Sequence, residues 1–200
     1  MRVAVVSAKG GTSKTTTSVL LAEAAALGGR ESMVVDLDGQ QSGCALSWAD
    51  LSAEDEPLRS LVTSLPVREL NRRLGDIAGE RFVCIDSPPG DSAAIAAAIR
   101  VADLVVVPLQ ARLADLDRAT TAIDLAAEYD VPAIAVLSRT RPRVKATGDI
   151  REALEAIGVG VAVTEVRESE RIGDAYGQRP SEVTLRPFTA LLAEIDKKGS

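Results

Sequence analysis

A turn rich in glycine, lysine and threonine near the amino terminus is the part of the chain best suited to chemistry. Residues 8–16 read Ala-Lys-Gly-Gly-Thr-Ser-Lys-Thr-Thr and lie between an apolar run, residues 3–6, and a helix-like stretch rich in alanine and leucine. Backbone N–H groups in such a turn, and in the first turn of the helix, point at a phosphate. Lys14 would add a positive charge, and Thr15 a hydroxyl for Mg²⁺. The pattern predicts a nucleotide-phosphate site; a glycine-rich hairpin with incidental lysines is the alternative.

Carboxylates end two later apolar runs. Asp36 and Asp38 follow one run, and Asp86 follows another. In open α/β sheets, ligands bind at the carboxyl ends of strands, which is where these side chains would lie. A buried carboxylate is costly unless it meets a cation or hydrogen-bond donors, and a shared Mg²⁺–phosphate site would meet that need for Asp36 and Asp86, partly through water. For Asp36 or Asp38 alone, a helix-cap or turn role is the alternative.

The elements that must position these groups alternate along the chain. Two hundred residues, 46% hydrophobic and 2% aromatic, suit a single α/β domain over residues 1–200 with a core of valine, leucine, isoleucine and alanine. The alternation predicts a mostly parallel twisted sheet with helices on both faces. We expect strands near 3–7, 33–38, 82–86, 104–108, 133–138 and 160–164, a short edge strand within 57–65, and helices near 15–27, 67–77, 92–99, 115–129, 147–157 and 187–197.

The composition argues against several classes of site. The chain has no histidine, and its two cysteines lack the C-x-x-C spacing, which argues against zinc sites, histidine-based catalysis and a disulfide framework. No apolar run approaches the roughly 20 residues that cross a bilayer. Because the sequence starts directly with a strand, we expect a cytoplasmic protein with no signal peptide and no amino-terminal DNA-reading domain. The net charge of −6 gives no hint of a nucleic-acid partner, so that question depends on local clusters.

The glycine-rich turn departs from the ordinary P-loop pattern, G-x-x-x-x-G-K-[ST], in a particular way. Ala8 and Ser13 stand where that pattern has glycine, and an additional Lys9 precedes Gly10 and Gly11. The resulting K-G-G-x-x-K-T resembles the deviant Walker A motif of the ParA/MinD family of P-loop ATPases. Residues 36–40 and 85–89 resemble that family's D-x-D-P-Q and I-D-x-P-P segments, with Gly39 in place of the usual proline. The resemblance covers roughly residues 2–178 and is greatest to small ParA proteins of plasmid partition.

The resemblance implies a P-loop NTPase fold, ATP and Mg²⁺ as cofactors, and slow ATP hydrolysis in a homodimer formed around two nucleotides. Lys9 would reach the nucleotide of the other subunit, Lys14 would bind its own, and Asp38 would position the attacking water. Asp86 would be the Walker B carboxylate, and the metal would be held by Thr15, Asp36 and Asp86. The residues expected to bind the nucleotide are Lys9, Gly10, Gly11, Thr12, Ser13, Lys14, Thr15 and Thr16, with Arg141 beside the adenine.

Basic residues cluster in the last third of the chain. Four cations and no acids lie between 139 and 145, and further arginines alternate with glutamates downstream. The resemblance implies non-specific DNA binding by the ATP-bound dimer, association with the nucleoid, and stimulation by a ParB-type centromere-binding partner. DNA affinity should then fall steeply with salt. A solvated loop held by ion pairs is the alternative. The residues expected to contact DNA are Arg143, Lys145, Arg167 and Arg171.

Two other functions are compatible with the same resemblance. A MinD-like ATPase would bind membranes through a basic amphipathic carboxy-terminal helix. Here an apolar stripe (Phe188, Leu191, Leu192 and Ile195) lies opposite Glu194 and Asp196, with only two lysines at the end, which favours a helix packed on the core and no membrane partner. A metabolic enzyme on the same fold is the second alternative, whereas a metal-cluster carrier would need paired cysteines.

Overall fold

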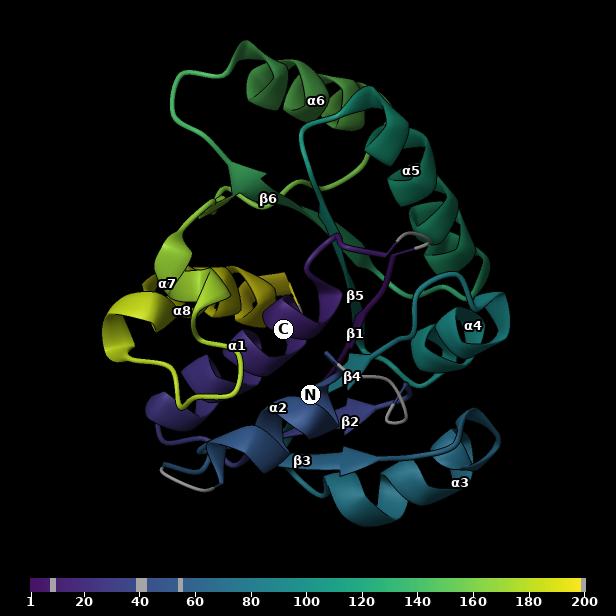
Figure 1. Ribbon diagram of the computed structural model, residues 1–200. Coiled ribbons are helices and arrows are strands. Elements are labelled where there is room, and N and C mark those ends of the chain that lie inside the picture. The colour runs from purple at the N-terminus through teal and green to yellow at the C-terminus, as the bar shows by residue number, and fades with distance from the viewer. Residues whose placement is uncertain (8–9, 39–42, 54–55, 199–200) are drawn as a thin grey trace.

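The computed structural model describes residues 1–7, 10–38, 43–53 and 56–198, which form an α/β structure of three layers (Figure 1). The strands in these residues are β1 (Arg2–Val5), β2 (Ser32–Asp36), β3 (Leu61–Ser64), β4 (Phe82–Asp86), β5 (Leu104–Leu109), β6 (Ala133–Thr140) and β7 (Val166–Arg167). They form one parallel sheet in the order β3-β2-β4-β1-β5-β6-β7. The predicted fold class, including the edge strand within 57–65, is therefore confirmed.

Helices cover both faces of this sheet (Figure 1). One face packs against α1, α2 and α8, with α7 at its margin, and the other against α3 to α6. The helices are α1 (Lys14–Leu27), α2 (Ala45–Ser52), α3 (Val67–Ala78), α4 (Ser92–Arg100), α5 (Leu113–Glu128), α6 (Lys145–Ala156), α7 (Glu170–Gly173) and α8 (Glu182–Lys198).

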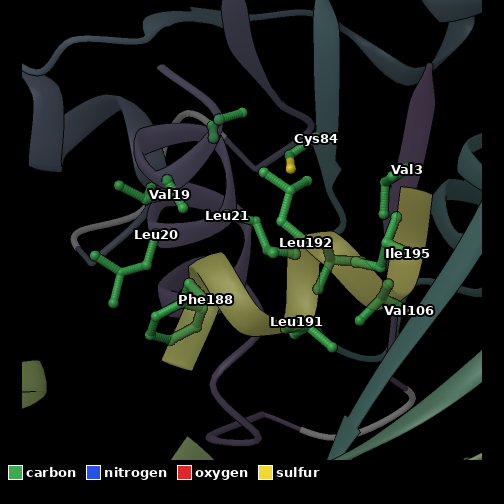
Figure 2. Packing of buried hydrophobic residues seen from close by; sticks show 14 of the residues in the cluster. Val3, Val19, Leu20, Leu21, Cys84, Val106, Phe188, Leu191, Leu192 and Ile195 are labelled. Atoms are coloured by element: carbon green, nitrogen blue, oxygen red, sulfur yellow. The ribbon is translucent and has the colours of Figure 1, made fainter. Parts of the chain in front are cut away.

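Alternation along the strands produces two cores. Successive side chains of a strand point to opposite faces, so Val3 and Val5 enter the core under α1 and α8 while Ala4 enters the core on the other face. Figure 2 shows the first core, in which side chains of α1 and α8 meet those of the central strands. Burying each large aliphatic side chain contributes about 1.5–3 kcal/mol, so this packing holds α1 firmly on the sheet.

The apolar stripe of α8 belongs to this core. Phe188, Leu191, Leu192 and Ile195 are all buried against the α1 side of the sheet (Figure 2), as the core-packed interpretation requires. The helix begins at Glu182, earlier than predicted, so Pro187 lies inside it. No helix among the described residues is long and apolar enough to span a membrane.

The prediction of a strand at 160–164 is wrong. Only Val161 forms an isolated bridge there, to Ala135, and the strand beside β6 is β7. The start of the segment makes two backbone hydrogen bonds with β6, from the Ala135 N–H to the Gly160 carbonyl and from the Ala162 N–H to the Ala135 carbonyl (2.8 Å each). After Ala162 the Glu194 carboxylate accepts hydrogen bonds from the N–H groups of Val163 (2.7 Å) and Thr164 (2.8 Å). The pairing with β6 therefore stops after one bridge, where a side-chain carboxylate takes over the next backbone N–H groups.

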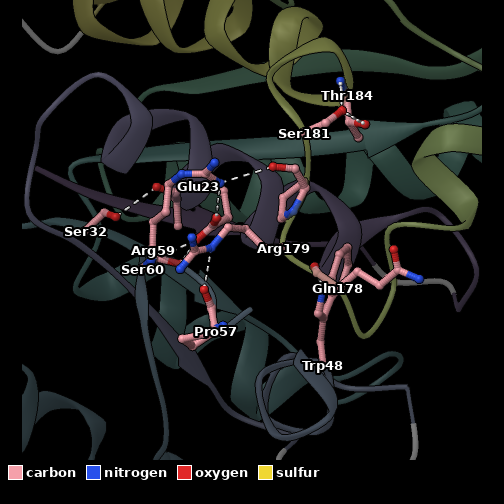
Figure 3. Close-up of polar contacts among 12 residues, drawn as sticks. Glu23, Ser32, Trp48, Pro57, Arg59, Ser60, Gln178, Arg179, Ser181 and Thr184 are labelled. Atoms are coloured by element: carbon pink, nitrogen blue, oxygen red, sulfur yellow. Dashed lines mark hydrogen bonds and ion pairs between the residues drawn. The ribbon is translucent and has the colours of Figure 1, made fainter. Parts of the chain in front are cut away.

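Residues 174–181 connect α7 to α8, and Figure 3 shows Gln178 near Trp48 and Arg179 near Pro57. The indole Nε1 of Trp48 in α2 donates to the Gln178 carbonyl (3.0 Å), and Arg179 Nε donates to the Pro57 carbonyl (2.6 Å). These contacts attach the segment before α8 to α2 and to the residues before β3.

Candidate functional site

The loop between β1 and α1 presents a helix N-terminus that no side chain caps. Ser13, at the N-cap of α1, has φ 70° and ψ 27° and makes no side-chain capping hydrogen bond. The N–H groups of the first turn of a helix have no partner within the helix and attract anions. The loop therefore directs the backbone donors of this first turn toward the carboxyl end of the sheet.

A hollow of about 330 Å³ opens at this point, and we call it the phosphate hollow. Its size is within the range of small-molecule sites. It is lined by Gly10, Gly11, Ser13, Lys14, Thr15, Thr16, Asp38, Gly43, Cys44, Asp86, Ser87 and Pro89. Three predicted groups, the glycine-rich loop, Asp38 and Asp86, are thus brought together.

Lys14 is only 6% exposed, and burial lowers the pKa of its ammonium group. The negative charges of Asp86 and Asp38 oppose that effect. A lysine in such a position would interact strongly with phosphate oxygens, because a water-poor site increases the energy between charges.

Asp86 is a buried carboxylate with few donors. It is 2% exposed, accepts a hydrogen bond from Ser18 Oγ (3.1 Å) and another from the Thr15 hydroxyl, and lies in register with Asp36 on the neighbouring strand. Burial, and then the charge of Asp36, raise the pKa of Asp86 to about 7, against the opposing effects of the two hydroxyls and Lys14. A bound cation would offset the cost of burying the Asp86 carboxylate beside the charge of Asp36.

The other two acidic residues have different environments. The Asp36 carboxylate is fully buried and accepts from the N–H groups of Asp38 (2.8 Å) and Leu46 (2.9 Å), which ties the start of α2 to the end of β2. Asp38 lines the phosphate hollow, and its pKa is raised by partial burial and by the charge of Asp36, while Lys14 opposes the shift. Asp38 is therefore the acidic side chain best placed to contact a ligand or water.

The residues present are suitable for a metal-bound nucleotide. Among the described residues, no group of three Asp, Glu, Cys or His side chains could hold a metal ion alone. A Mg²⁺ ion commonly keeps waters and takes one or two carboxylates together with substrate phosphates, which matches the Thr15 hydroxyl and Asp86 beside the uncapped helix end.

A second hollow, of about 140 Å³, adjoins the first and shares Ser13, Thr15, Thr16 and Gly43 with it. We call it the ring hollow, because Trp48 and Tyr176 line it with ring centroids 5.4 Å apart. A ligand with phosphates at the loop could place an aromatic base here.

Some predicted residues lie elsewhere. Lys9 is outside the described residues, as are Gly39 and Gln40, so the role of Lys9 stays a prediction. The side chain of Thr12 is buried outside the lining of the phosphate hollow. Arg141 lines neither hollow described above; it forms an ion pair with Glu168.

The residues predicted to contact DNA lie around the β6–β7 edge of the sheet. Arg167 is in register with Thr140 of β6, and Arg143 and Lys145 follow β6 directly, at the start of α6. Arg167 and Arg171 share the lining of one surface hollow. All four side chains are exposed, and the neighbouring glutamates pair with other arginines: Glu168 with Arg141 and Glu165 with Arg151.

Several residues of the site were missed in the sequence. Ser18 lies one helical turn after Lys14 on the same face, and that spacing could have indicated it. Gln110 Nε2 donates to the Gly11 carbonyl (3.2 Å) and so supports the loop from β5. Trp48 and Tyr176 gave no usable signal, because their contact joins segments far apart in the chain.

Comparison with known proteins places this geometry in context. A family profile described as the CobQ/CobB/MinD/ParA nucleotide binding domain matches residues 3–180. A curated protein of Gloeobacter kilaueensis, maintenance of carboxysome distribution protein A, is 37% identical over 116 residues, which are 53% of this chain and 47% of that protein. The chain thus spans about half the length of that relative.

Solved structures share the fold at low sequence identity. The septum site-determining protein MinD of Pyrococcus horikoshii, complexed with Mg-ADP, is 18% identical over 100% of this chain and 97% of its own, with a TM-score of 0.75. A putative plasmid partition protein of Borrelia burgdorferi, bound to AMPPNP, is 15% identical over 98% of both chains, with a TM-score of 0.77.

Proposed function

The chain belongs to the CobQ/CobB/MinD/ParA nucleotide binding domain family, and on that premise we propose that it is a ParA-type ATPase that positions or partitions a cargo. The observation that carries the proposal is the convergence of Lys14, the uncapped start of α1 and the donor-poor Asp86 on one hollow. The adjoining ring hollow gives a base a place beside the phosphates.

The residues of the chain divide the work of phosphoryl transfer, which depends mostly on positioning and charge stabilisation. Lys14 and the first-turn N–H groups would bind the phosphates, while Thr15 and Asp86 would hold Mg²⁺. Asp36, predicted as a third metal group, is fully buried and does not line the phosphate hollow, so its charge would act on the metal from behind Asp86. When bound, the metal ion neutralises phosphate charge. Asp38 orients the attacking water, and Lys9 of a second copy completes the site in an ATP-dependent homodimer.

Replacing Asp38 with alanine tests this division. The Asp38→Ala variant should bind ATP yet hydrolyse it slowly, so that dimers persist with ATP in light scattering. Asp76→Ala, an exposed position on α3, serves as the control and should behave as the original protein does. Normal turnover by Asp38→Ala would contradict the assignment.

The proposed partners are non-specific DNA, which would place the ATP-bound protein on the nucleoid, and a ParB-type protein that stimulates hydrolysis. The exposed cations Arg143, Lys145, Arg167 and Arg171 support the first of these. The carboxysome-distribution relative supports a protein assembly, besides a plasmid or chromosome, as cargo.

DNA binding is tested by titrating a duplex at several salt concentrations, with ADP and with a non-hydrolysable ATP analogue. Affinity should appear only with the analogue and fall as salt rises. Arg143→Ala combined with Arg171→Ala should abolish it, whereas the control pair Arg72→Ala and Arg73→Ala, on α3, should not. Retained binding in the first pair would remove this assignment.

A further inference from the structure

Three consecutive residues between α7 and α8, which we call the 176–178 segment, lie against α2. The Tyr176 hydroxyl is 2.6 Å from Ser47 Oγ, so these two groups share a hydrogen bond. The indole Nε1 of Trp48 donates to the Gln178 carbonyl (3.0 Å), as Figure 3 shows. The segment and α2 are therefore joined side by side, although Ser47 and Tyr176 are 129 positions apart in the sequence.

The middle residue of the segment, Gly177, allows this close approach. Its φ is +76°, in the left-handed region that residues with a Cβ atom disfavour. A Cβ atom added there would lie 3.1 Å from Leu51 Cβ and 3.2 Å from Leu51 Cδ1, on the last part of α2. Glycine thus lets the segment pack directly on α2 and holds Tyr176 beside the helix.

Tyr176 also lines the ring hollow, where a ligand can reach it. Its ring centroid lies 5.4 Å from that of Trp48, and both residues belong to the lining. Trp48 is 1% exposed, whereas Tyr176 is 37% exposed, so the tyrosine is the member of the pair that offers surface to a ligand. Aromatic side chains are the usual stacking partners of nucleobases. A base in the ring hollow would therefore contact Tyr176 first.

The first turn of α2 is tied to Asp38 through one buried carboxylate. Leu46, the residue before Ser47, donates its backbone N–H to Asp36 Oδ2 (2.9 Å). Asp38 donates its own N–H to Asp36 Oδ1 (2.8 Å). Because Asp36 is fully buried, no water competes for these two hydrogen bonds. The position of Asp38 thus depends on where α2 begins.

We propose that Tyr176 and Ser47 are positioning residues, through which a base in the ring hollow fixes Asp38 for hydrolysis. The base contacts the tyrosine ring, and the hydrogen bond between the two hydroxyls holds the first turn of α2. Asp36 then passes that position on to Asp38. The inference rests on the proposed function and adds to it, because hydrolysis comes to depend on the base as well as on the phosphates.

The hydrogen bond between the two hydroxyls can be removed by itself. Ser47 Oγ also donates to the Cys44 carbonyl (3.0 Å), so Tyr176→Phe leaves no unpaired hydroxyl on α2, and the phenylalanine ring stays in the hollow. Tyr176→Phe should lower kcat for ATP about fivefold, as expected for the loss of one hydrogen bond that acts on the transition state. KM should stay the same, because the contact with the base is kept. Initial rates over a range of ATP concentrations give both constants.

Tyr129→Phe is the matched control. Tyr129 ends α5 on the opposite face of the sheet, where its hydroxyl accepts from Arg100 Nη2 (2.7 Å). Losing this hydroxyl should change neither kcat nor KM. If Tyr176 is only structural, Tyr176→Phe will lower the thermal midpoint and leave kcat unchanged well below that temperature, and this result would overturn the inference.

A double-mutant cycle tests the link between the two residues. Ser47→Ala should lower kcat as Tyr176→Phe does, whereas Ser47→Thr keeps a hydroxyl and should retain the rate. The combined Ser47→Ala and Tyr176→Phe variant should be no slower than the slower single variant, because both changes remove the same hydrogen bond. Effects that multiply would show that the two residues act independently, against the inference.

Binding without hydrolysis tests the contact with the base. Calorimetric titrations with ADP and with inorganic pyrophosphate, both with Mg²⁺, compare ligands that share two phosphates and differ in the nucleoside. Tyr176→Ala should weaken ADP binding about tenfold, because stacking surface is lost, and leave pyrophosphate binding unchanged. Equal changes for the two ligands would overturn the contact.

The two levels of the argument fail in different ways. If the original protein does not hydrolyse ATP, the proposed function fails, and the inference fails with it. If the original protein hydrolyses ATP and Tyr176→Phe does so with the same kcat, the inference alone is overturned.

Discussion

The two ends of α1 each bury a carboxylate, and the two are held very differently. Toward the carboxyl end, Glu23 is 0% exposed and accepts from the N–H (2.7 Å) and Oγ (2.8 Å) of Ser60 and from Arg59 Nη1 (3.1 Å) (Figure 3). At the amino end, Asp86 has two hydroxyl donors and faces Asp36. Full pairing indicates a structural cluster, whereas incomplete pairing indicates a place for a ligand.

The same contrast appears in the backbone. At the amino end of α1, Ser13 adopts a left-handed conformation that residues with a Cβ atom disfavour. Strain and underpaired charge are characteristic of functional sites, where binding a ligand offsets them. Helix α1 thus has a fully paired carboxylate, Glu23, near its carboxyl end and an incompletely paired ligand site at its amino end.

The largest expected effect on stability comes from removing the Glu23 carboxylate. Glu23→Ala leaves Arg59 and both Ser60 donors without their acceptor, and should lower the free energy of unfolding by about 3 kcal/mol. Urea unfolding followed by circular dichroism measures this. Glu69→Ala is the control, since that carboxylate pairs with Arg72 and Arg73 on the surface, and it should cost less than about 1 kcal/mol. Equal losses of unfolding free energy in the two variants would contradict the assignment of Glu23 to a fully paired structural cluster.

The pH dependence of stability is the next largest effect. The pKa of Asp86 is raised to about 7 from its ordinary 3.8, so its stabilisation of the fold is complete below about pH 4 and is lost as pH rises through 7. The nucleotide-free protein should lose about 2 kcal/mol between about pH 5 and about pH 8. Asp86→Asn should flatten this slope; a slope that persists in the variant would assign it to another group.

The smallest effect concerns the strained turn. Ser13→Gly removes a Cβ from a left-handed residue but adds freedom to the unfolded chain, so we expect a net gain of about 0.5 kcal/mol. Thermal unfolding can resolve this against Ser13→Ala, which keeps the Cβ and should give no gain. A gain in both variants would point to the hydroxyl instead of the backbone.

Local patterns predicted much of the fold. The alternation of apolar runs with helical stretches gave β1, β2, β4, β5 and β6, because a parallel sheet buried on both faces needs near-continuous apolar strands. The prediction was wrong for 160–164, where the Glu194 carboxylate competes for the backbone N–H groups. Glu194 lies 31 residues after Val163 and 30 after Thr164, so this contact leaves no local signal in the sequence.

Local patterns likewise predicted only part of the candidate site. The glycine-rich turn, Asp38 and Asp86 were identified because each follows a strand, and the carboxyl ends of parallel strands lie at one edge of the sheet. Helix α2 was not predicted: it is short, and its first turn is held by the Cys44 thiol and the Asp36 carboxylate, which are tertiary and unusual caps. The ion pairs of Arg141 with Glu168 and of Glu23 with Arg59 likewise join segments far apart in the chain, so no local signal in the sequence indicated them.

The position of Trp48 provides an optical signal that needs no label. It is the only tryptophan of the chain, it is buried, and it lines the ring hollow beside Tyr176. Emission excited selectively in the indole band therefore comes from one known point, within reach of any base stacked there. A change in its intensity would report occupancy of that hollow in real time.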